Sequence, residues 1–261
     1  MPQLAVTPDA IHLWSCFCDE ITDSGLLSKY NSLMEEHEKT RHQRFHFEKH
    51  QHQYLVTRAL VRTVLSLYAD IEPDQWRFTK NQYGRPEISP LVLGQKPYLN
   101  LRFNLSHADG LIICGVTTNR EIGVDVENLT RSNDLLGIAD RYFSSTEVKD
   151  LFSQPAYRQT QRFFDYWTLK ESYIKARGMG LSLPLDQFSF HIQPDASTII
   201  SFDPRLKDNP AHWRFWQYKP SEDHQIALAT QSASLTAQTP HIHSYRIIPL
   251  KSWSDFAMPE L

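Results

Sequence analysis

Hydrophobic and polar residues alternate along three consecutive stretches in the middle of the chain. In residues 99–105 every second residue is Leu or Phe, and the residues between them are Asn or Arg. Residues 111–117 and 122–127 follow with strand-forming composition, and the turn-forming pairs Asp109-Gly110 and Asn119-Arg120 separate them. Alternation with a period of two is typical of half-buried strands. We therefore expect these three strands to form a meander.

Helical spacing dominates two other stretches, at residues 54–68 and 163–180. The first (YLVTRALVRTVLSLY) is apolar over so broad a surface that a largely buried helix is predicted. Each half of the chain thus shows helices followed by strands, which indicates an α+β fold. The proline-containing loops at 204–210 and 234–240 are expected to be surface connections or the start of a loose C-terminal tail. Shorter elements are expected at residues 11–17 (strand), 26–38 (helix), 76–79 (strand), 144–152 (helix), and 188–192, 198–202, 214–218 and 225–230 (strands).

The helix at 163–180 carries a carboxylate on an apolar face. Phe163, Trp167, Glu171 and Ile174 share one side of the helix, and Glu171 is its polar member. Lys175 follows Glu171 by four residues, so a solvated ion pair at the helix edge is one interpretation. Glycines at 178 and 180 can adopt the left-handed backbone that ends a helix.

The strand at 122–127 places two carboxylates side by side. Asp125 and Glu127 point to the same face, about 7 Å apart, and such a pair repels unless a cation lies near it. A solvated outer face is the simpler interpretation. Against it, Gly123 lies on the same face and leaves room for another group to approach.

Composition narrows the class of protein. The chain has 261 residues, 41% hydrophobic and 22% charged, as in soluble globular proteins. Its formal charge of -3 argues against nucleic-acid binding through a basic surface. The three cysteines make no disulfide framework, and neither an export signal nor a membrane-spanning run is present, so we expect a cytoplasmic protein.

Three carboxylates without thiolate or imidazole partners suit a hard ion, Mg²⁺ or Mn²⁺. Such an ion completes its shell with water and phosphate oxygens, so chemistry on a phosphate ester or anhydride is expected. Cationic residues for that substrate are available at Lys175, His107 and Arg85, and in the basic run 39–50 (KTRHQRFHFEKH).

Three motifs in this order and spacing resemble the 4′-phosphopantetheinyl transferases of the long, surfactin-synthetase-activating type. They are FNLSH at 103–107, IGVDVE at 122–127 and WTLKESYIK at 167–175. QYGRP at 82–86 and GLSLPL at 180–185 also fit, and the likeness extends from about residue 41 to residue 190. The resemblance implies two similar α/β subdomains related by a pseudo-twofold, which we place at residues 1–118 and 119–261. It also implies transfer of phosphopantetheine from coenzyme A to a carrier-protein serine, with release of adenosine 3′,5′-bisphosphate.

The resemblance further implies roles for individual residues. Asp125, Glu127 and Glu171 would hold Mg²⁺ on the pyrophosphate, while His107 and Lys175 would contact phosphate oxygens. Glu171, Lys175 and His107 are thus the expected catalytic residues, with Glu171 taking the serine proton directly or through metal-bound water. The coenzyme A contacts are expected at Tyr83, Gly84, Arg85, Pro86, Ser106 and Arg41, the last meeting the 3′-phosphate. The family often has a second basic residue where this chain has Glu38; either Lys39 replaces it or the 3′-phosphate is bound more weakly.

Two alternatives belong to other classes. A non-catalytic coenzyme A or nucleotide-binding module would be expected to lack one or more of the metal carboxylates, yet all three are present. Another Mg²⁺-dependent phosphate enzyme, such as a hydrolase, would share the carboxylates without needing the motifs at 104–107 and 167–175. The expected partners are coenzyme A and an apo acyl or peptidyl carrier domain, with neither nucleic acid nor membrane, and a monomer is expected.

Overall fold

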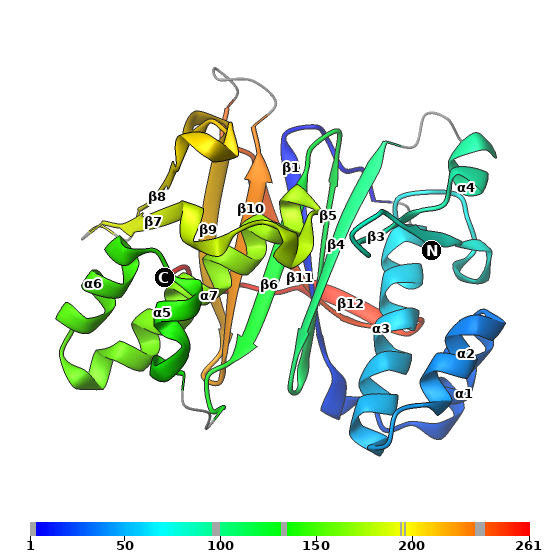
Figure 1. Ribbon diagram of the computed structural model, residues 1–261. Helices are drawn as coiled ribbons and strands as arrows, with labels where there is room; N and C mark the ends of the chain where they lie inside the picture. Colours follow the sequence, from blue (N-terminus) through cyan, green and yellow to red (C-terminus); the bar gives the residue numbers. More distant parts are fainter. Residues whose placement is uncertain (1–3, 96–99, 132–134, 194, 196, 233–237) are drawn as a thin grey trace. The chain divides into compact units, whose positions relative to one another are not determined.

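The computed structural model describes residues 4–95, 100–131, 135–193, 195, 197–232 and 238–261, which form two compact units (Figure 1). Unit 1 comprises Met1–Lys80, Pro86–Asn119 and Pro240–Ala257. Unit 2 comprises Asn81–Arg85, Arg120–Thr239 and Met258–Leu261. The main division falls after residue 119, close to the expected boundary at 118/119. Two segments lie on the other side of it from the rest of their unit: residues 81–85 belong to unit 2, and residues 240–257 belong to unit 1.

Unit 1 is built on a five-stranded sheet with the order β12-β11-β1-β5-β4. Strand β1 pairs antiparallel with β5 and parallel with β11, so residues near both ends of the chain lie side by side. Of the two expectations for the end of the chain, the loose tail is wrong, because residues 241–248 form a paired strand. Leu99, the expected first residue of β4, lies outside the described residues. The strands are β1 (Ala10–Phe17), β4 (Leu101–Ala108), β5 (Leu111–Thr118), β11 (His241–Ile248) and β12 (Ser252–Asp255).

Helix α3 (Glu48–Ser66) carries the core of unit 1 against this sheet (Figure 1). Val56, Leu60 and Val64 are fully buried among side chains of β1 and β5, as the broad apolar surface of 54–68 predicts. Burial of this kind contributes roughly 1.5–3 kcal/mol per large aliphatic side chain. The other elements are α1 (Ser24–Leu33), α2 (Glu36–Gln43), α4 (Pro90–Gln95), the hairpin β2 (Phe78–Lys80) and β3 (Pro86–Ile88), and the 3₁₀ turns Cys18–Glu20 and Pro73–Gln75.

Unit 2 is built on a three-stranded sheet with the order β6-β10-β9, covered on one face by helix α7 (Figure 1). Strand β6 pairs with β10, about 100 residues later in the chain, and not with β5. The three-stranded meander is therefore wrong: β4 and β5 form a hairpin in unit 1, and β6 begins the second sheet. The three strands are β6 (Ile122–Asn128), β9 (Trp213–Ser221) and β10 (His224–Gln231).

Helix α7 (Ala156–Arg177) is the longest element of unit 2 and ends where its sequence predicts. Gly178 takes the left-handed conformation, with φ of 63°, and its N–H bonds the Lys175 carbonyl. Ser144 caps α6 through a reciprocal capping box with Glu147. The remaining elements are α5 (Ala139–Tyr142), α6 (Ser145–Ser153), β7 (Phe188–Ile192), β8 (Thr198–Phe202), and the 3₁₀ turns Leu136–Ile138, Gly180–Ser182, Leu185–Gln187, Pro204–Leu206 and Pro210–His212.

Helices and sheets thus occupy separate layers in each unit, and the strand pairings are antiparallel apart from β1–β11, which confirms the predicted α+β class. Within the described ranges, no helix combines the length and the apolar character needed to cross a lipid bilayer.

Candidate active site

In unit 2 the backbones of strand β6 and helix α7 are in direct contact at Gly123. A Cβ atom built on Gly123 would lie 2.0 Å from the Ser172 carbonyl oxygen and 2.4 Å from the Ala176 nitrogen. Only glycine permits this contact. Gly123 therefore leaves the space that the sequence predicts, and the backbone of α7 fills it. The face of β6 that carries Asp125 and Glu127 is consequently covered by the helix and is not a solvated outer face.

Each β6 carboxylate has a partner on or near α7. Asp125 is 4% exposed, and its Oδ1 accepts a hydrogen bond from Lys175 Nζ at 2.6 Å. Glu127 Oε1 accepts from Trp167 Nε1 at 2.8 Å, and its Oε2 lies 3.2 Å from Arg131 Nη1. The short ion pair of Lys175 is therefore made with Asp125, on strand β6. This pair is largely buried, unlike the solvated pair with Glu171 at the helix edge that the spacing alone suggests.

Glu171 belongs to the same electrostatic cluster. Burial, followed by the negative charge of Asp125, raises the pKa of Glu171 to about 7, and Glu127 adds to the rise. Burial and Asp125 also raise the pKa of Glu127. Carboxylates that shift one another in this way lie close together and favour a proton or a cation among them. The structure thus brings together Asp125, Glu127, Glu171 and Lys175, as the sequence predicts.

Aromatic packing fixes the helix face that bears Glu171. Phe163 and Trp167 stack with ring centroids 5.9 Å apart and an interplanar angle of 10°. The adjacent residue, Lys170, points the other way into the core, where Nζ donates to the carbonyls of Leu185 and Phe188. Neighbouring residues on a helix diverge by about 100°, so one turn of α7 serves both the core and the carboxylate cluster.

The loop Asn81–Arg85 is fastened to the C-terminal end of α7. Asn81 Nδ2 donates to the Gly178 carbonyl at 2.8 Å, and Arg85 Nη1 donates to the Ala176 carbonyl at 3.0 Å. Arg85 Nη1 also lies 2.7 Å from Glu121 Oε2. Gly84 has a φ of 91°, the left-handed region that glycine tolerates. This arrangement joins the predicted contact residues Tyr83, Gly84 and Arg85 to the helix of Glu171 and Lys175.

The other predicted contact residues belong to unit 1. Arg41 and Lys39 lie on α2, Ser106 and His107 lie on β4, and Pro86 begins β3. Ser106 is buried and His107 is exposed; the alternation predicted along β4 breaks at Asn104, which is buried although it is expected on the polar face. The Arg41 guanidinium lies 5.7 Å from the centre of the Tyr54 ring, while Lys39 Nζ lies 3.7 Å from Glu36.

Comparison with known proteins matches nearly the whole chain to one family. Residues 121–229 match the 4′-phosphopantetheinyl transferase superfamily, and residues 23–118 match the 4′-phosphopantetheinyl transferase N-terminal family. The chain is 31% identical over 229 residues to 4′-phosphopantetheinyl transferase HetI of Nostoc sp., covering 87% of this chain and 90% of the relative. The chain belongs to the 4′-phosphopantetheinyl transferase family. The resemblance inferred from the three motifs is therefore confirmed, as is the enzyme class.

Other relatives of this transferase agree. It is 34% identical over 201 residues to 4′-phosphopantetheinyl transferase Sfp of Bacillus subtilis, covering 77% of this chain and 84% of the relative. The crystal structure of Thermotoga maritima holo-[acyl-carrier-protein] synthase overlaps 44% of this chain and 64% of its own, with 18% identity and a TM-score of 0.36. That overlap is too limited to carry any argument about the site.

The magnesium set of the transferase remains a prediction. Within the part of the chain that the structure describes, no group of three His, Cys, Asp or Glu side chains has the geometry of a metal site. The Asp125 and Glu127 carboxylates are instead directed at Lys175, Trp167 and Arg131. What supports the metal site is the donor chemistry and the raised pKa values of Glu127 and Glu171, to both of which the charge of Asp125 contributes.

Sequence reasoning missed several residues that shape these sites. Arg131 follows Glu127 by four residues, a spacing that offered a signal. The helical spacing places Trp167 only on an apolar face, yet its indole N–H reaches Glu127. Arg58 also lies against Tyr54, with the guanidinium carbon 5.2 Å from the ring centre. Arg58 and Tyr54 are four residues apart on α3, but their relation to Arg41 depends on how α2 packs, which no local pattern encodes.

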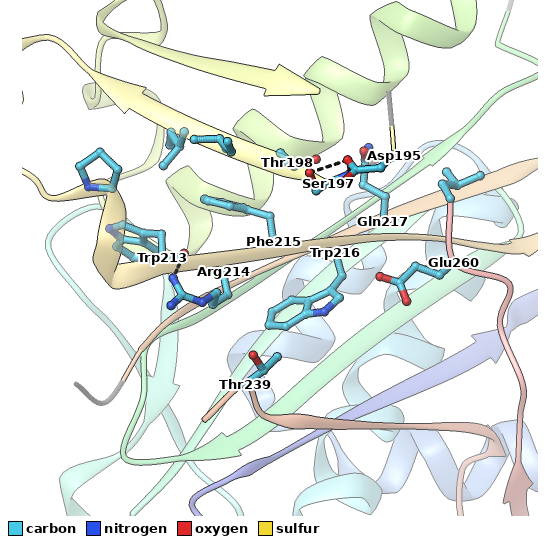
Figure 2. Close-up of a pocket in the computed structure, with 14 residues that line it drawn as sticks. Asp195, Ser197, Thr198, Trp213, Arg214, Phe215, Trp216, Gln217, Thr239 and Glu260 are labelled. Carbon is cyan, nitrogen blue, oxygen red and sulfur yellow. Dashed lines mark hydrogen bonds between the residues drawn. The ribbon is translucent and has the colours of Figure 1, made fainter. Parts of the chain in front are cut away.

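Unit 2 also holds a pocket of about 730 Å³ along strand β9, apart from these residues (Figure 2). Phe215 and Trp216 point to opposite sides of the strand, and Asp195 and Glu260 lie toward one end (Figure 2). Arg214, on the same strand, donates to the carbonyls of Ala211 and Trp213. None of the predicted site residues lines this pocket, so its volume is no guide to the chemistry.

Proposed function

We propose that this transferase moves the 4′-phosphopantetheine group of coenzyme A to a serine of an apo acyl or peptidyl carrier protein with the help of Mg²⁺. The observation that carries the proposal is the buried face shared by β6 and α7, where Asp125, Glu127, Glu171 and Lys175 gather. Three carboxylates against Lys175 and Arg131 leave a surplus of negative charge. Positioning and charge stabilisation are what phosphoryl transfer asks of a protein.

Mg²⁺ fits this face because the donors are carboxylate oxygens and because the cluster favours an added positive charge. Asp125, Glu127 and Glu171 would hold it. When bound, the ion would neutralise charge on the pyrophosphate of coenzyme A. The raised pKa values of Glu127 and Glu171 support this assignment, since both rises come in part from neighbouring carboxylates.

Glu171 is the proposed proton acceptor. Burial and Asp125 raise the pKa of Glu171 to about 7, so without a bound cation this carboxylate takes up a proton near neutral pH, where a base is effective; a bound Mg²⁺ would lower that pKa. The serine oxygen would attack the phosphorus that carries the pantetheine arm while its proton passes to the Glu171 carboxylate. The bond from that phosphorus to the bridging oxygen would break, and adenosine 3′,5′-bisphosphate would leave.

Lys175 and His107 are the proposed phosphate contacts. Lys175 Nζ is held at 2.6 Å by Asp125, yet its side chain is 26% exposed, so part of it remains accessible to a ligand. His107 lies exposed on β4 of unit 1. Tyr83, Gly84, Arg85, Pro86 and Ser106 are proposed for the adenine and ribose end of coenzyme A. We also propose that the enzyme acts as a cytoplasmic monomer, and its three free, buried cysteines are in keeping with a reducing compartment.

The test is transfer itself. The protein would be incubated with coenzyme A, Mg²⁺ and a panel of apo carrier domains, and intact masses would be measured. We expect a mass gain of one phosphopantetheine arm on at least one carrier, lost with a chelator and lost in Glu171→Gln. Release of adenosine 3′,5′-bisphosphate without a carrier adduct would instead favour the hydrolase, and binding without turnover would favour the non-catalytic module.

A further inference from the structure

Helices α2 and α3 of unit 1 gather guanidinium groups around one aromatic ring. The guanidinium carbons of Arg41 and Arg58 lie 5.7 Å and 5.2 Å from the centre of the Tyr54 ring. Arg62 is one helical turn beyond Arg58 on the same side of α3. Like charges at such spacing repel, so the cluster needs a counterion.

Glu38 pairs closely with Arg62 and at longer range with Arg58, so one carboxylate faces more than one guanidinium. It is 4% exposed, its Oε2 lies 2.7 Å from Arg62 Nη2, and its Oε1 accepts from Arg62 Nη1 at 3.3 Å. The same carboxylate accepts the backbone N–H of Glu35 at the start of α2. An acidic residue stands here, where the family often has a basic one, because a buried arginine on α3 requires it.

Arg58 is held less tightly by this network than Arg62 is. Its Nη1 lies 3.7 Å from Glu38 Oε1, an ion pair without a hydrogen bond, and among the residues that the structure describes its buried Nε has no hydrogen-bond partner. The side chain is 18% exposed, so part of it remains at the surface. Arg58 therefore keeps donor capacity for an anion.

Lys39 is turned away from this cluster. Arg41 follows Glu38 by three residues and shares its face of α2, whereas Lys39 is rotated by about 100° from Glu38. Lys39 Nζ lies 3.7 Å from Glu36, whose side chain is 88% exposed. An exposed pair of this kind contributes little, and its position leaves the cluster around Tyr54 to Arg41 and Arg58.

We propose that Arg58, paired with Arg41 across the Tyr54 ring, is the second cation that recognises the 3′-phosphate of coenzyme A. The proposal rests on the proposed function. Guanidinium groups present planar pairs of donors that match phosphate oxygens, and two of them suit a dianion. Arg58 is thereby a specificity residue, which distinguishes coenzyme A from its analogue without the 3′-phosphate, and Lys39 has no part in that recognition.

The test compares two donors, coenzyme A and 3′-dephospho-coenzyme A, in the wild type and in Arg58→Gln, Arg58→Lys, Arg41→Gln and Lys39→Gln. Losing one charge-assisted contact should raise KM for coenzyme A about ten-fold or more in Arg58→Gln and Arg41→Gln. KM for the dephospho donor should change less than about two-fold, so discrimination collapses. Arg58→Lys, which keeps the charge without the planar fork, should be intermediate. The exposed Lys29→Gln serves as a control for net charge and should match the wild type.

Calorimetric binding of both donors, measured without a carrier, separates this proposal from the proposed function. If the wild type transfers nothing but still prefers coenzyme A in an Arg58-dependent way, only the proposed function fails. The proposal is overturned if Arg58→Gln and Arg58→Lys weaken both donors equally, or if Lys39→Gln and not Arg58→Gln abolishes discrimination. Thermal unfolding of each variant identifies any that fail to fold, and Arg58→Lys then decides.

Discussion

The two units contain the same buried arrangement, a glutamate on a short helix paired with a cation on the long helix, in different surroundings. In unit 1, Glu38 closes the capping box of α2 and pairs with Arg62 on the long helix α3. In unit 2, Glu147 closes the capping box of α6 and pairs with Lys170 on the long helix α7, at 2.8 Å. In both, a short helix is attached to a long one by a glutamate that also satisfies a helix N-terminus.

The residues beside each pair carry opposite charge. Arg58, next to the Glu38–Arg62 pair, adds positive charge around Tyr54, whereas Glu171, next to Lys170, adds negative charge beside Asp125 and Glu127. One unit thus collects cations at the surface of its long helix and the other collects carboxylates. The shared glutamate–cation pair leaves the neighbouring helix face free to differ in chemistry. For the proposed coenzyme A donor, this would mean phosphate binding in one unit and metal and proton chemistry in the other.

The largest predicted effect distinguishes the two units, because a change in unit 2 should lower kcat and leave coenzyme A binding intact. Asp125→Asn removes a carboxylate from the acidic face and the partner of Lys175, so kcat should fall about 10³-fold. Coenzyme A should still bind, because its proposed 3′-phosphate contacts lie in unit 1. Transfer by mass spectrometry and binding by calorimetry measure the two quantities.

Asp140→Asn, at an exposed position of α5, is the matched control and should retain wild-type kcat. If Asp125→Asn turns over near the wild-type rate, Asp125 has no part in the metal site.

The second prediction compares the buried pairs by stability. Removing one member of a buried ion pair costs about 3–5 kcal/mol, because the other charge remains uncompensated. Glu147→Ala should lie at the upper end, since Glu147 also accepts the buried N–H groups of Ser144 and Phe190. Glu38→Ala should cost less, because Glu35 lies 3.7 Å from Arg62 and can partly replace it. Denaturant unfolding measures both.

Glu36→Ala, at an 88% exposed side chain on α2, should stay within about 0.5 kcal/mol of the wild type. Equal losses for Glu38→Ala and Glu147→Ala would show that the extra hydrogen bonds of Glu147 add nothing to its pair.

The acidic site could be predicted from the sequence more fully than the basic one. The acidic residues follow from patterns within single elements, whereas the basic cluster depends on contacts between elements. Asp125 and Glu127 follow from alternation within one strand, Glu171 and Lys175 follow from spacing within one helix, and the family resemblance joins the two. The cluster around Tyr54 depends on how α2 packs on α3. Glu38, read as a departure from the family, makes sense only beside Arg62, 24 residues away.

The fold shows the same limit. Local pattern gave most strands and the long helices, but it could not tell that β6 pairs with β10 or that β11 lies parallel to β1. The β1–β11 pairing joins residues more than 200 positions apart. A meander is the default for consecutive strands, and here the helix packed at Gly123 and the β10 partner outweigh that default.

A third prediction concerns the part of the acidic site that sequence reasoning assigned to packing. Trp167→Phe keeps an aromatic ring against Phe163 but removes the N–H that donates to Glu127 at 2.8 Å. Glu127 would then be held by Arg131 alone, so kcat should fall about ten-fold, with a higher Mg²⁺ concentration needed for half-maximal rate. Trp216→Phe, a tryptophan in the β9 pocket, should change neither value. If the Mg²⁺ requirement is unchanged, Trp167 does not orient a metal ligand.

The last prediction is a pH dependence of stability contributed by unit 1. His12 is 4% exposed, its Nδ1 lies 2.7 Å from the Tyr68 hydroxyl, and its ring packs against His243 and Tyr245. Burial, with a smaller contribution from His243, lowers the pKa of His12 from 6.5 to about 4. Between these values the unfolded chain binds a proton that the folded chain does not, so the free energy of unfolding should decrease as pH falls from about 6.5 to 4. His12→Gln should flatten this slope in denaturant unfolding measured at several pH values. Identical slopes in the two proteins would mean that His12 takes up its proton in the folded state as readily as in the unfolded chain.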